Sequence, residues 1–334
     1  MQASFITSYG GDEVMAFGEL PEPVPAEGQA LIEVRAAGVN PVELSMRAGR
    51  FQKVFPYRFP QVLGLDISGI VVHAPEGSGF RPGDEVYARM PNDAQGAYAE
   101  RAVLPASLLA MKPARMSHVE AASLPTIALT TWQSFFERAH LKKGERLLIQ
   151  AGAGGVGTFA IQLAKHVGAH VTATAGTANQ DFLRELGVDR AVDYTRERFE
   201  DAGPYDVVYD GVSGNLVERG ITSLAPGGRY IGLVQVADVE SYLSIGLPEP
   251  IAKAAAAVAL KFGELARARG GEFHGPLTRP DGAQLGEIAR LVDAGVLKAV
   301  VSKVYPLDQL AAAYAAMATG RTRGKVVIDV TARS

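Results

Sequence analysis

A glycine-rich segment between an apolar run and a helical pattern is the part of this sequence best suited to chemistry. Residues 147–149 are apolar, residues 151–157 read Ala-Gly-Ala-Gly-Gly-Val-Gly, and apolar residues recur at helical spacing from Thr158 onward. A strand, a tight turn and a helix in this order direct backbone N–H groups at an anion, and the glycines let a pyrophosphate approach the chain. The segment predicts a dinucleotide site rather than a purely structural turn, because the strand and the helix supply the required context.

The end of the next predicted strand bears on the choice between the two nicotinamide dinucleotides. An acidic residue about 20 residues past the glycines would favour the free ribose hydroxyl of NAD. Residues 174–179 contain no acid. Hydroxyl and amide donors to a 2′-phosphate are offered there by Thr174, Thr177 and Asn179, with Arg184 and Tyr194 further along. The pattern favours NADPH; the alternative is that Thr177 and Asn179 only cap the helix that starts near Gln180.

Composition narrows the remaining classes of function. The 334 residues contain no cysteine, so disulfides and thiolate catalysis are excluded, and the six histidines form no metal-binding pair, so no metal site is predicted. A net charge of −3 gives no electrostatic reason to expect nucleic acid or an anionic membrane as a partner. No signal-peptide pattern opens the chain, and lysine and glutamate interrupt the alanine-rich stretch 251–268. We therefore expect neither a membrane span nor export, and a cytoplasmic location.

Two sequence patterns, one in each part of the chain, indicate which elements position these residues. Residues 1 to about 120 carry short β-type runs with frequent Pro and Gly turns, which predicts a β barrel or sandwich-like unit. Strands and helices then alternate, which predicts an α/β fold with a doubly wound parallel sheet. The predicted strands are 146–150, 169–174, 206–209, 229–233 and, at an edge, 272–275; the predicted helices are 127–139, 155–167, 179–186 and 249–269. The tail, with helices at 282–294 and 307–318 and strands at 300–305 and 325–329, is expected to complete the N-terminal unit.

Several further motifs, spread over nearly the whole length, identify a family. They are Ala36-Ala37-Gly38-Val39-Asn40-Pro41, Gly64-Leu65-Asp66-Ile67-Ser68-Gly69, the run from Gly79 to Val86, the glycine segment, Pro226-Gly227-Gly228-Arg229 and Gly324-Lys325-Val326-Val327. By these residues the chain resembles the medium-chain dehydrogenase/reductase superfamily, in its zinc-free quinone oxidoreductase branch. The resemblance implies a GroES-like β-rich catalytic domain, residues 1–122 and 277–334, and a Rossmann NADP-binding domain, residues 123–276.

The same resemblance bears on metal chemistry. Zinc-dependent relatives carry a Gly-His-Glu ligand motif at the place of Gly64-Leu65-Asp66 and a cysteine near position 38. This chain has Leu65 and Gly38 there. The resemblance therefore implies that no zinc acts as a Lewis acid, which argues against alcohol oxidation.

The activity that the branch implies is NADPH-dependent reduction of quinones or α,β-unsaturated carbonyl compounds. Asn40 would lie near the nicotinamide and the substrate, and Thr130 and Lys325 would lie against the cofactor. The pyrophosphate would face Gly152, Ala153, Gly154, Gly155, Val156 and Gly157, and Tyr194 would touch the 2′-phosphate. From the residues alone, each has a structural alternative. Asn40 before Pro41 would be a turn residue, Thr130 a buried helix hydroxyl and Lys325 a solvated edge charge.

The chain departs from the branch after Asn40. Relatives often carry an Asp, then a Tyr two residues later and a second Tyr beyond the next Gly, whereas this chain has Glu43, Ser45 and Phe51. A tyrosine proton donor is therefore missing at this position, which leaves water or a ribose hydroxyl. Two alternative functions stay open: an enoyl-thioester reductase, and an NADPH-binding sensor or interaction protein with low turnover.

An exposed sheet edge predicts self-association. Residues 271–275 follow the last helix of the predicted Rossmann domain and read as a short strand with an unpaired edge. Proteins cover or pair such edges. We expect a homodimer in which two copies of this edge pair about a two-fold axis; the alternative is an edge that a loop and the charge of Glu272 protect.

Overall fold

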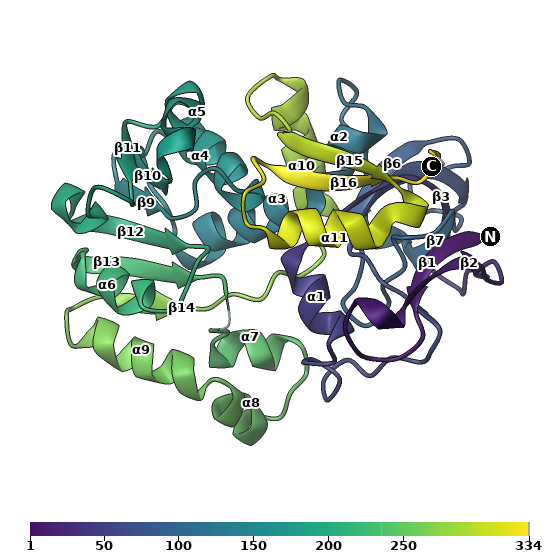
Figure 1. The fold of residues 1–334 in the computed structure, drawn as a ribbon, viewed down its shortest axis with the longest axis horizontal. Coiled ribbons are helices and arrows are strands. Elements are labelled where there is room, and N and C mark those ends of the chain that lie inside the picture. The colour runs from purple at the N-terminus through teal and green to yellow at the C-terminus, as the bar shows by residue number, and fades with distance from the viewer. Residues whose placement is uncertain (235, 333–334) are drawn as a thin grey trace. The chain divides into compact units, whose positions relative to one another are not determined.

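The computed structural model describes residues 1–234 and 236–332, which form two compact units. One unit comprises Met1–Leu129 and Arg279–Ser334, and the other comprises Thr130–Thr278. Figure 1 shows the order of their elements along the chain. Each unit has its own sheet and its own cluster of buried apolar side chains.

The unit 130–278 is built on a six-stranded sheet in the order β11-β10-β9-β12-β13-β14, in which every pairing is parallel. The apolar run 147–149 is fully buried in its central strand, because helices cover a parallel sheet on its faces. This confirms the predicted Rossmann-type fold. The strands are β9 (Arg146–Ile149), β10 (His170–Ala175), β11 (Arg190–Asp193), β12 (Tyr205–Asp210), β13 (Leu224–Gly232) and β14 (Glu272–His274). The helices include α4 (Gly155–Val167), α5 (Gln180–Glu185), α6 (Leu216–Thr222) and α7 (Val239–Ser244).

Several elements of this unit differ from the sequence prediction. Helices α6 and α7 were not predicted, and three further elements differ as follows. The single helix expected over 249–269 is two helices, α8 (Glu249–Ala255) and α9 (Ala257–Arg267), because Ala256 between them has a ψ of 9°. An alanine run carries no capping residue that would mark such a break. The helix expected over 127–139 is α3 (Pro125–Trp132) followed by a π-helical segment, Gln133–Arg138. Strand β11 was not predicted, since four residues are too few to show a period.

The unit formed by the two ends of the chain is rich in antiparallel strands. Its larger sheet has the order β15-β16-β3-β5-β6-β8, with β7 also paired to β3, and a second sheet has the order β2-β1-β4. The shorter strands are β1 (Gln2–Ile6), β2 (Met15–Glu19), β4 (Gln61–Val62), β7 (Arg101–Pro105) and β8 (Leu109–Met111). The C-terminal β16 pairs with β3 through Val327 and Gly38, so the tail completes the N-terminal sheet. The strands that matter below are β3 (Gln29–Gly38), β5 (Asp66–His73), β6 (Glu85–Arg89), β15 (Val301–Pro306) and β16 (Lys325–Asp329). The helices are α1 (Pro41–Arg47), α2 (His118–Ala122), α10 (Gly282–Asp293) and α11 (Leu310–Ala318).

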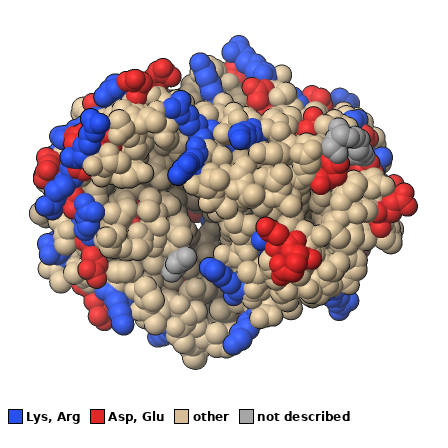
Figure 2. Space-filling model, viewed as in Figure 1, with Lys and Arg blue, Asp and Glu red and all other residues tan. Residues whose placement is uncertain are grey.

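The surface carries charges of both signs. On the face drawn in Figure 2, acidic and basic side chains are interspersed over much of the protein. Within the described part of the chain, no helix combines the length and the apolarity that crossing a bilayer requires.

Candidate functional site

The glycine segment forms a turn between the carboxyl end of β9 and the start of α4. Ala151 takes a left-handed φ of 56°, and Gly154 is the residue that precedes α4. No side chain caps this end of the helix. The first N–H groups of a helix have no partner within it, and they carry a partial positive charge. This end of α4 is therefore suited to receive an anion.

The glycines of this turn serve different purposes. A Cβ at Gly152 would lie 2.9 Å from the Cβ of Ala173, and one at Gly157 would lie 2.4 Å from the carbonyl oxygen of Ala151. Both glycines are therefore required by the packing of the unit on itself. A Cβ at Gly154 would meet no atom nearer than 3.4 Å. Of these three glycines, only Gly154 would admit a Cβ at an ordinary contact distance, and it lies at the helix end where a pyrophosphate would approach.

The three polar residues predicted near the end of β10 make different contacts in the structure. The hydroxyl of Thr174 accepts a hydrogen bond from the backbone N–H of Ala151 at 3.3 Å, so it supports the glycine turn. Asn179 precedes α5 without capping it through its side chain. The hydroxyl of Thr177 donates to the carboxylate of Asp193 at 2.6 Å. Asn179 therefore stands at the capping position of α5 without making the capping bond, and Thr177 has a partner on the neighbouring strand.

Asp193 is a candidate site residue that sequence reasoning missed. It ends β11 opposite Ala175 of β10, and it also accepts hydrogen bonds from the backbone N–H and hydroxyl of Thr195 at 3.0 and 2.7 Å. The Thr177 hydroxyl is the largest of the influences that lower the pKa of Asp193. A charged carboxylate thus lies beside Thr177. The search for an acid covered only the end of β10, whereas parallel pairing brings this one from the neighbouring strand.

The remaining residues predicted for this unit lie at its surface or near its boundary. Tyr194 is 64% exposed, with its hydroxyl beside Gly176. Arg184 is paired with Asp181 at 2.5 Å. The hydroxyl of Thr130, in α3, lies 2.6 Å from that of Thr278.

A second group of predicted residues meets in the other unit, where Asn40 precedes α1. Asn40 is only 2% exposed, and its side-chain amide is fully used. The Nδ2 group donates to Asp66 at 2.9 Å and to Glu43 at 3.2 Å, and the Oδ1 atom accepts from the ammonium of Lys325 at 2.6 Å. Asn40 and Glu43 also form a capping box at the start of α1. The turn interpretation of Asn40 is therefore correct, but it describes only part of the residue's contacts.

Lys325 is buried rather than solvated. It begins β16, its side chain is 5% exposed, and its ammonium also donates to the carbonyl of Val39 at 2.6 Å. Its distance to the carboxylate of Asp66 is 3.8 Å. Burial lowers the pKa of Lys325, and the carboxylates of Asp66 and Glu43 oppose that shift. The alternative of an exposed edge charge is therefore wrong.

Glu43 connects the rest of this group, which we call the Glu43 network: Asn40, Glu43, Asp66, Tyr98, Tyr314 and Lys325. Its carboxylate accepts hydrogen bonds from the hydroxyls of Tyr98 and Tyr314 and from the backbone N–H of Leu65 at 3.2 Å. Burial raises the pKa of Glu43 to about 7. The sequence signal that could have found it is the Asn-x-x-Glu spacing of a capping box.

The residues at the positions of the zinc motif have other contacts in the structure. A Cβ at Gly38 would lie 2.4 Å from the carbonyl oxygen of Ala122, so a larger residue does not fit there without movement. The carboxylate of Asp66 is occupied by the backbone N–H and hydroxyl of Thr126 as well as by Asn40. Among the residues that the structure describes, no three His, Cys, Asp or Glu side chains are grouped to hold a metal.

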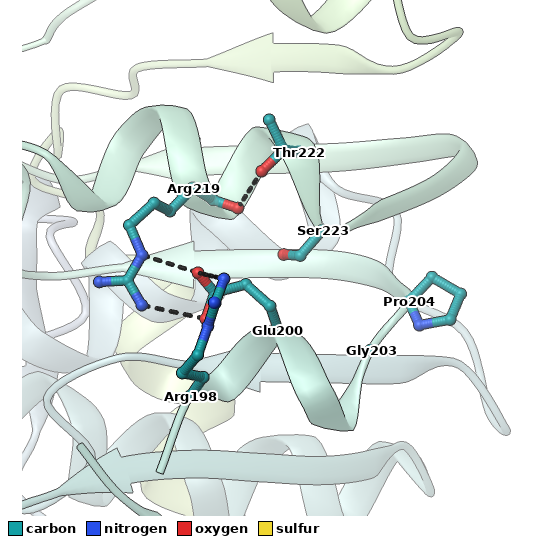
Figure 3. A pocket seen from close by; sticks show the side chains of 7 residues that line it. All are labelled: Arg198, Glu200, Gly203, Pro204, Arg219, Thr222 and Ser223. Atoms are coloured by element: carbon teal, nitrogen blue, oxygen red, sulfur yellow. Dashed lines mark hydrogen bonds and ion pairs between the residues drawn. The ribbon is translucent and has the colours of Figure 1, made fainter. Parts of the chain in front are cut away.

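Figure 3 shows a surface pocket in the unit 130–278. Its walls include Pro204, before β12, and Ser223, before β13. These are the amino ends of parallel strands, while the glycine turn follows the carboxyl end of β9, so the two lie at opposite edges of one sheet. Arg219 binds the carboxylate of Glu200 through two hydrogen bonds of 2.7 and 3.0 Å. The charged groups of the pocket thus partner each other, and it is not the dinucleotide site.

Comparison with known proteins places the chain in a family. Residues 26–114 match the family described as alcohol dehydrogenase GroES-like domain, and residues 186–328 match the one described as zinc-binding dehydrogenase. The chain is 31% identical to the mitochondrial NAD(P)H oxidoreductase RTN4IP1 of Danio rerio, over 99% of this chain and 91% of the relative. It is 36% identical to the chloroplastic NADPH-dependent alkenal/one oxidoreductase of Arabidopsis thaliana, over 70% of this chain and 62% of the relative. The quinone oxidoreductase structure from Coxiella burnetii superposes with a TM-score of 0.87 at 30% identity, covering 99% of both chains.

Proposed function

Because this chain belongs to the medium-chain dehydrogenase/reductase superfamily, in its quinone oxidoreductase branch, we propose that it reduces quinones or α,β-unsaturated carbonyl compounds with NADPH and without zinc. The observation that carries the proposal is the uncapped end of α4 at Gly154. The names of the relatives, a quinone oxidoreductase and an alkenal/one oxidoreductase, support the substrate class.

The residues around Gly154 fit a dinucleotide. The backbone N–H groups at the start of α4 would bind the pyrophosphate, and Thr174 would hold the turn that presents them. Bound NADPH would supply a hydride to the electrophilic carbon of the substrate. The reduction also consumes one proton, for which we assign no side chain, because Tyr98 and Tyr314 are buried and burial raises the pKa of each.

The preference for NADPH over NADH has observations both for and against it. Support comes from the lack of an acid at the end of β10, from the exposed Tyr194 and from the name of the Arabidopsis relative. Asp193 acts against it, since its charge next to Thr177 would repel a 2′-phosphate. Calorimetric titration with both cofactors tests the preference, and equal affinities would contradict it.

Independence from zinc rests on the side chains that replace the ligands. Gly38 leaves no space for a cysteine, and the oxygens of Asp66 are already bound by Thr126, Asn40 and Lys325. Turnover should therefore survive prolonged treatment with a strong chelator. Activity lost on chelation and restored by Zn²⁺ would overturn this point.

In the proposed reaction, Asn40 is the catalytic residue on the substrate side of the Glu43 network. Charge develops on the conjugated oxygen as hydride arrives, and donors aimed at that oxygen stabilise it. The amide of Asn40 makes such a contact by exchanging its bond to Asp66 for one to the substrate, while its bond to Glu43 stays in place. The buried ammonium of Lys325 supplies a fixed positive charge beside it.

Steady-state oxidation of NADPH with a panel of small quinones, enones and enoyl thioesters tests the function. We expect turnover with quinones or enones and little with thioesters carrying a long acyl chain. Preference for the thioesters would favour the first alternative, and tight NADPH binding without turnover would favour the sensor.

We also propose a cytoplasmic homodimer joined at β14. This strand ends the sheet, and no described strand pairs with its outer edge. The ring of Phe273 stacks on that of Tyr230, with 5.5 Å between the ring centroids. A substitution at Phe273 would therefore disturb the packing of the unit 130–278 as well as the proposed interface. Light scattering on the wild type is therefore the cleaner test, and a strict monomer at micromolar concentration would refute the dimer.

A further inference from the structure

Glu43 is the most completely bonded carboxylate of the Glu43 network. It is fully buried in the first turn of α1. The Oε1 atom accepts from the backbone N–H of Leu65 and from the Nδ2 group of Asn40, both at 3.2 Å. The Oε2 atom accepts from the backbone N–H of Asn40 and from the hydroxyl of Tyr314, each at 3.3 Å, and from the hydroxyl of Tyr98. Such a set offsets the cost of removing a carboxylate from water.

These contacts fix which way the amide of Asn40 faces. Its NH₂ group lies between the carboxylates of Glu43 and Asp66, and its oxygen lies against the ammonium of Lys325. The reverse orientation would set an oxygen against two carboxylates and a donor against a cation. The amide direction is therefore set by charge, and Glu43 supplies one of the two carboxylates that set it.

We propose that Glu43 is a positioning residue of the reductase reaction, whose carboxylate form holds Asn40 with its amide oxygen on Lys325. This inference rests on the proposed function. Tyr98 can adapt to a protonated Glu43, because its hydroxyl also lies 3.3 Å from the carbonyl oxygen of Gly38. The hydroxyl can donate to that carbonyl and accept a hydrogen bond from the neutral carboxylic acid. The neutral acid then accepts more weakly from Asn40, and the amide is held less firmly.

The charges around Glu43 determine when this change occurs. The cations facing it are Lys325, on β16, and Arg89, on β6; Asp66, on β5, is the opposing anion. Tyr98 and Tyr314 are neutral donors, and the guanidinium of Arg47 lies over the ring of Tyr314. Burial outweighs the attractions and raises the pKa of Glu43 to about 7. The two forms of Glu43 therefore interchange in the neutral range of pH.

The test compares Glu43→Gln and Glu43→Asp with a matched control, Glu120→Gln. Glu120 is the third residue of a second capping box, at α2, and lies outside the network. We expect Glu43→Gln to lower kcat about 100-fold, the usual effect of misplacing a reacting group. Its Kd for NADPH should change by less than about twofold, because the pyrophosphate turn is in the other unit. Wild-type kcat should rise with pH through about 7, Glu43→Gln should show no such rise, Glu43→Asp should recover part of the loss, and Glu120→Gln should match the wild type.

Three results would overturn the inference: full kcat in Glu43→Gln, a wild-type kcat independent of pH between 6 and 8, or an equal loss in Glu120→Gln. If Glu43→Gln does not fold, the wild-type profile and Glu43→Asp still decide. A wild type inactive on the whole panel would instead contradict the proposed function. The side-chain amide signal of Asn40, followed by NMR without cofactor, separates the two failures. It should shift with pH near 7 in the wild type and not in Glu43→Gln; a signal that ignores pH would contradict the positioning role.

Discussion

The glycine turn and the Glu43 network are built in opposite ways. The turn occupies residues 151–157, and its geometry follows from neighbours close in the chain. The network joins Asn40 and Glu43 to Asp66 and Lys325, which are up to 285 positions apart along the chain. Short-range sequence patterns therefore reveal the first site, whereas the second exists only once β3, β5 and β16 are assembled. A motif search finds a contiguous binding site and misses a dispersed polar network.

The two regions also differ in how they treat charge. The turn offers backbone dipoles to an anion from outside, and no side-chain charge is buried in it. The network buries ionisable groups of both signs and satisfies them internally. Removing a charged partner from the network should therefore lower the free energy of unfolding. Blocking the turn should instead weaken the binding of NADPH. The predictions below test that contrast.

The largest expected effect is on folding, from Lys325→Met. This variant leaves the oxygens of Asp66 and Asn40 without their cation, and removing one partner of a buried pair costs about 3–5 kcal/mol. Chemical denaturation measures the loss. Lys303→Met, at an exposed lysine on β15, is the control and should stay within about 0.5 kcal/mol of the wild type. Equal stabilities of the two variants would show that the contacts of Lys325 with Asp66 and Asn40 do not stabilise the fold.

The next effect is on binding, from Gly154→Val. Space for a side chain exists at Gly154 in the protein itself, and its φ of −76° suits any residue. The variant should fold with a loss of about 1 kcal/mol or less. It should bind NADPH at least about 100-fold more weakly, since each charge-assisted bond to a phosphate is worth about 1.5–3 kcal/mol.

Gly157→Val is the matched variant within the same turn. Its Cβ would lie 2.4 Å from the carbonyl oxygen of Ala151, so it should destabilise the fold instead. Calorimetric titration and thermal unfolding separate the two outcomes. Unchanged NADPH affinity in a folded Gly154→Val would show that the turn does not bind the cofactor.

A third prediction concerns stability against pH. The pKa of Glu43 is about 7 in the folded protein and near 4.5 in an exposed chain, so the folded state binds this proton more tightly. The contribution of Glu43 to stability is therefore greatest below pH 4.5 and is lost as the pH rises to about 7. The stability of the wild type minus that of Glu43→Gln should fall across this window. A difference that rises with pH would contradict the assignment.

The smallest expected effect is on cofactor choice, from Asp193→Asn. Removing the charge beside Thr177 should improve binding of NADPH relative to NADH by about tenfold, or about 1.4 kcal/mol. Glu185→Gln, at an exposed carboxylate in the last turn of α5, is the control and should leave the ratio unchanged. An unchanged ratio in Asp193→Asn would place the 2′-phosphate away from this carboxylate.

Much of the fold could be predicted because local patterns specify it. The alternation of strands and helices and the turn at 151–157 are properties of adjacent residues. The break at Ala256 and the strand ending at Asp193 could not be predicted, because neither carries a capping residue or a readable period.

The residues of the candidate site could be predicted in part, but the contacts between those that are distant in the sequence could not. The roles of Asn40 and Lys325 were assigned from family resemblance alone, and their direct contact follows only from the pairing of β16 with β3. Glu43 was noticed as a departure from the family, yet its importance depends on tyrosines at positions 98 and 314 that no local pattern connects to it.

The transfer of isotope from NADPH to an enone is the most direct test of the proposed reaction. The protein is incubated with NADPH carrying deuterium at both C4 positions of the nicotinamide and with a small enone, and the product is examined by mass spectrometry and NMR. Hydride transfer predicts one deuterium per product molecule, at the β carbon, with the same yield in the presence of a chelator. NADPH oxidation without deuterium in the reduced product, or no reduced product at all, would contradict the proposed function.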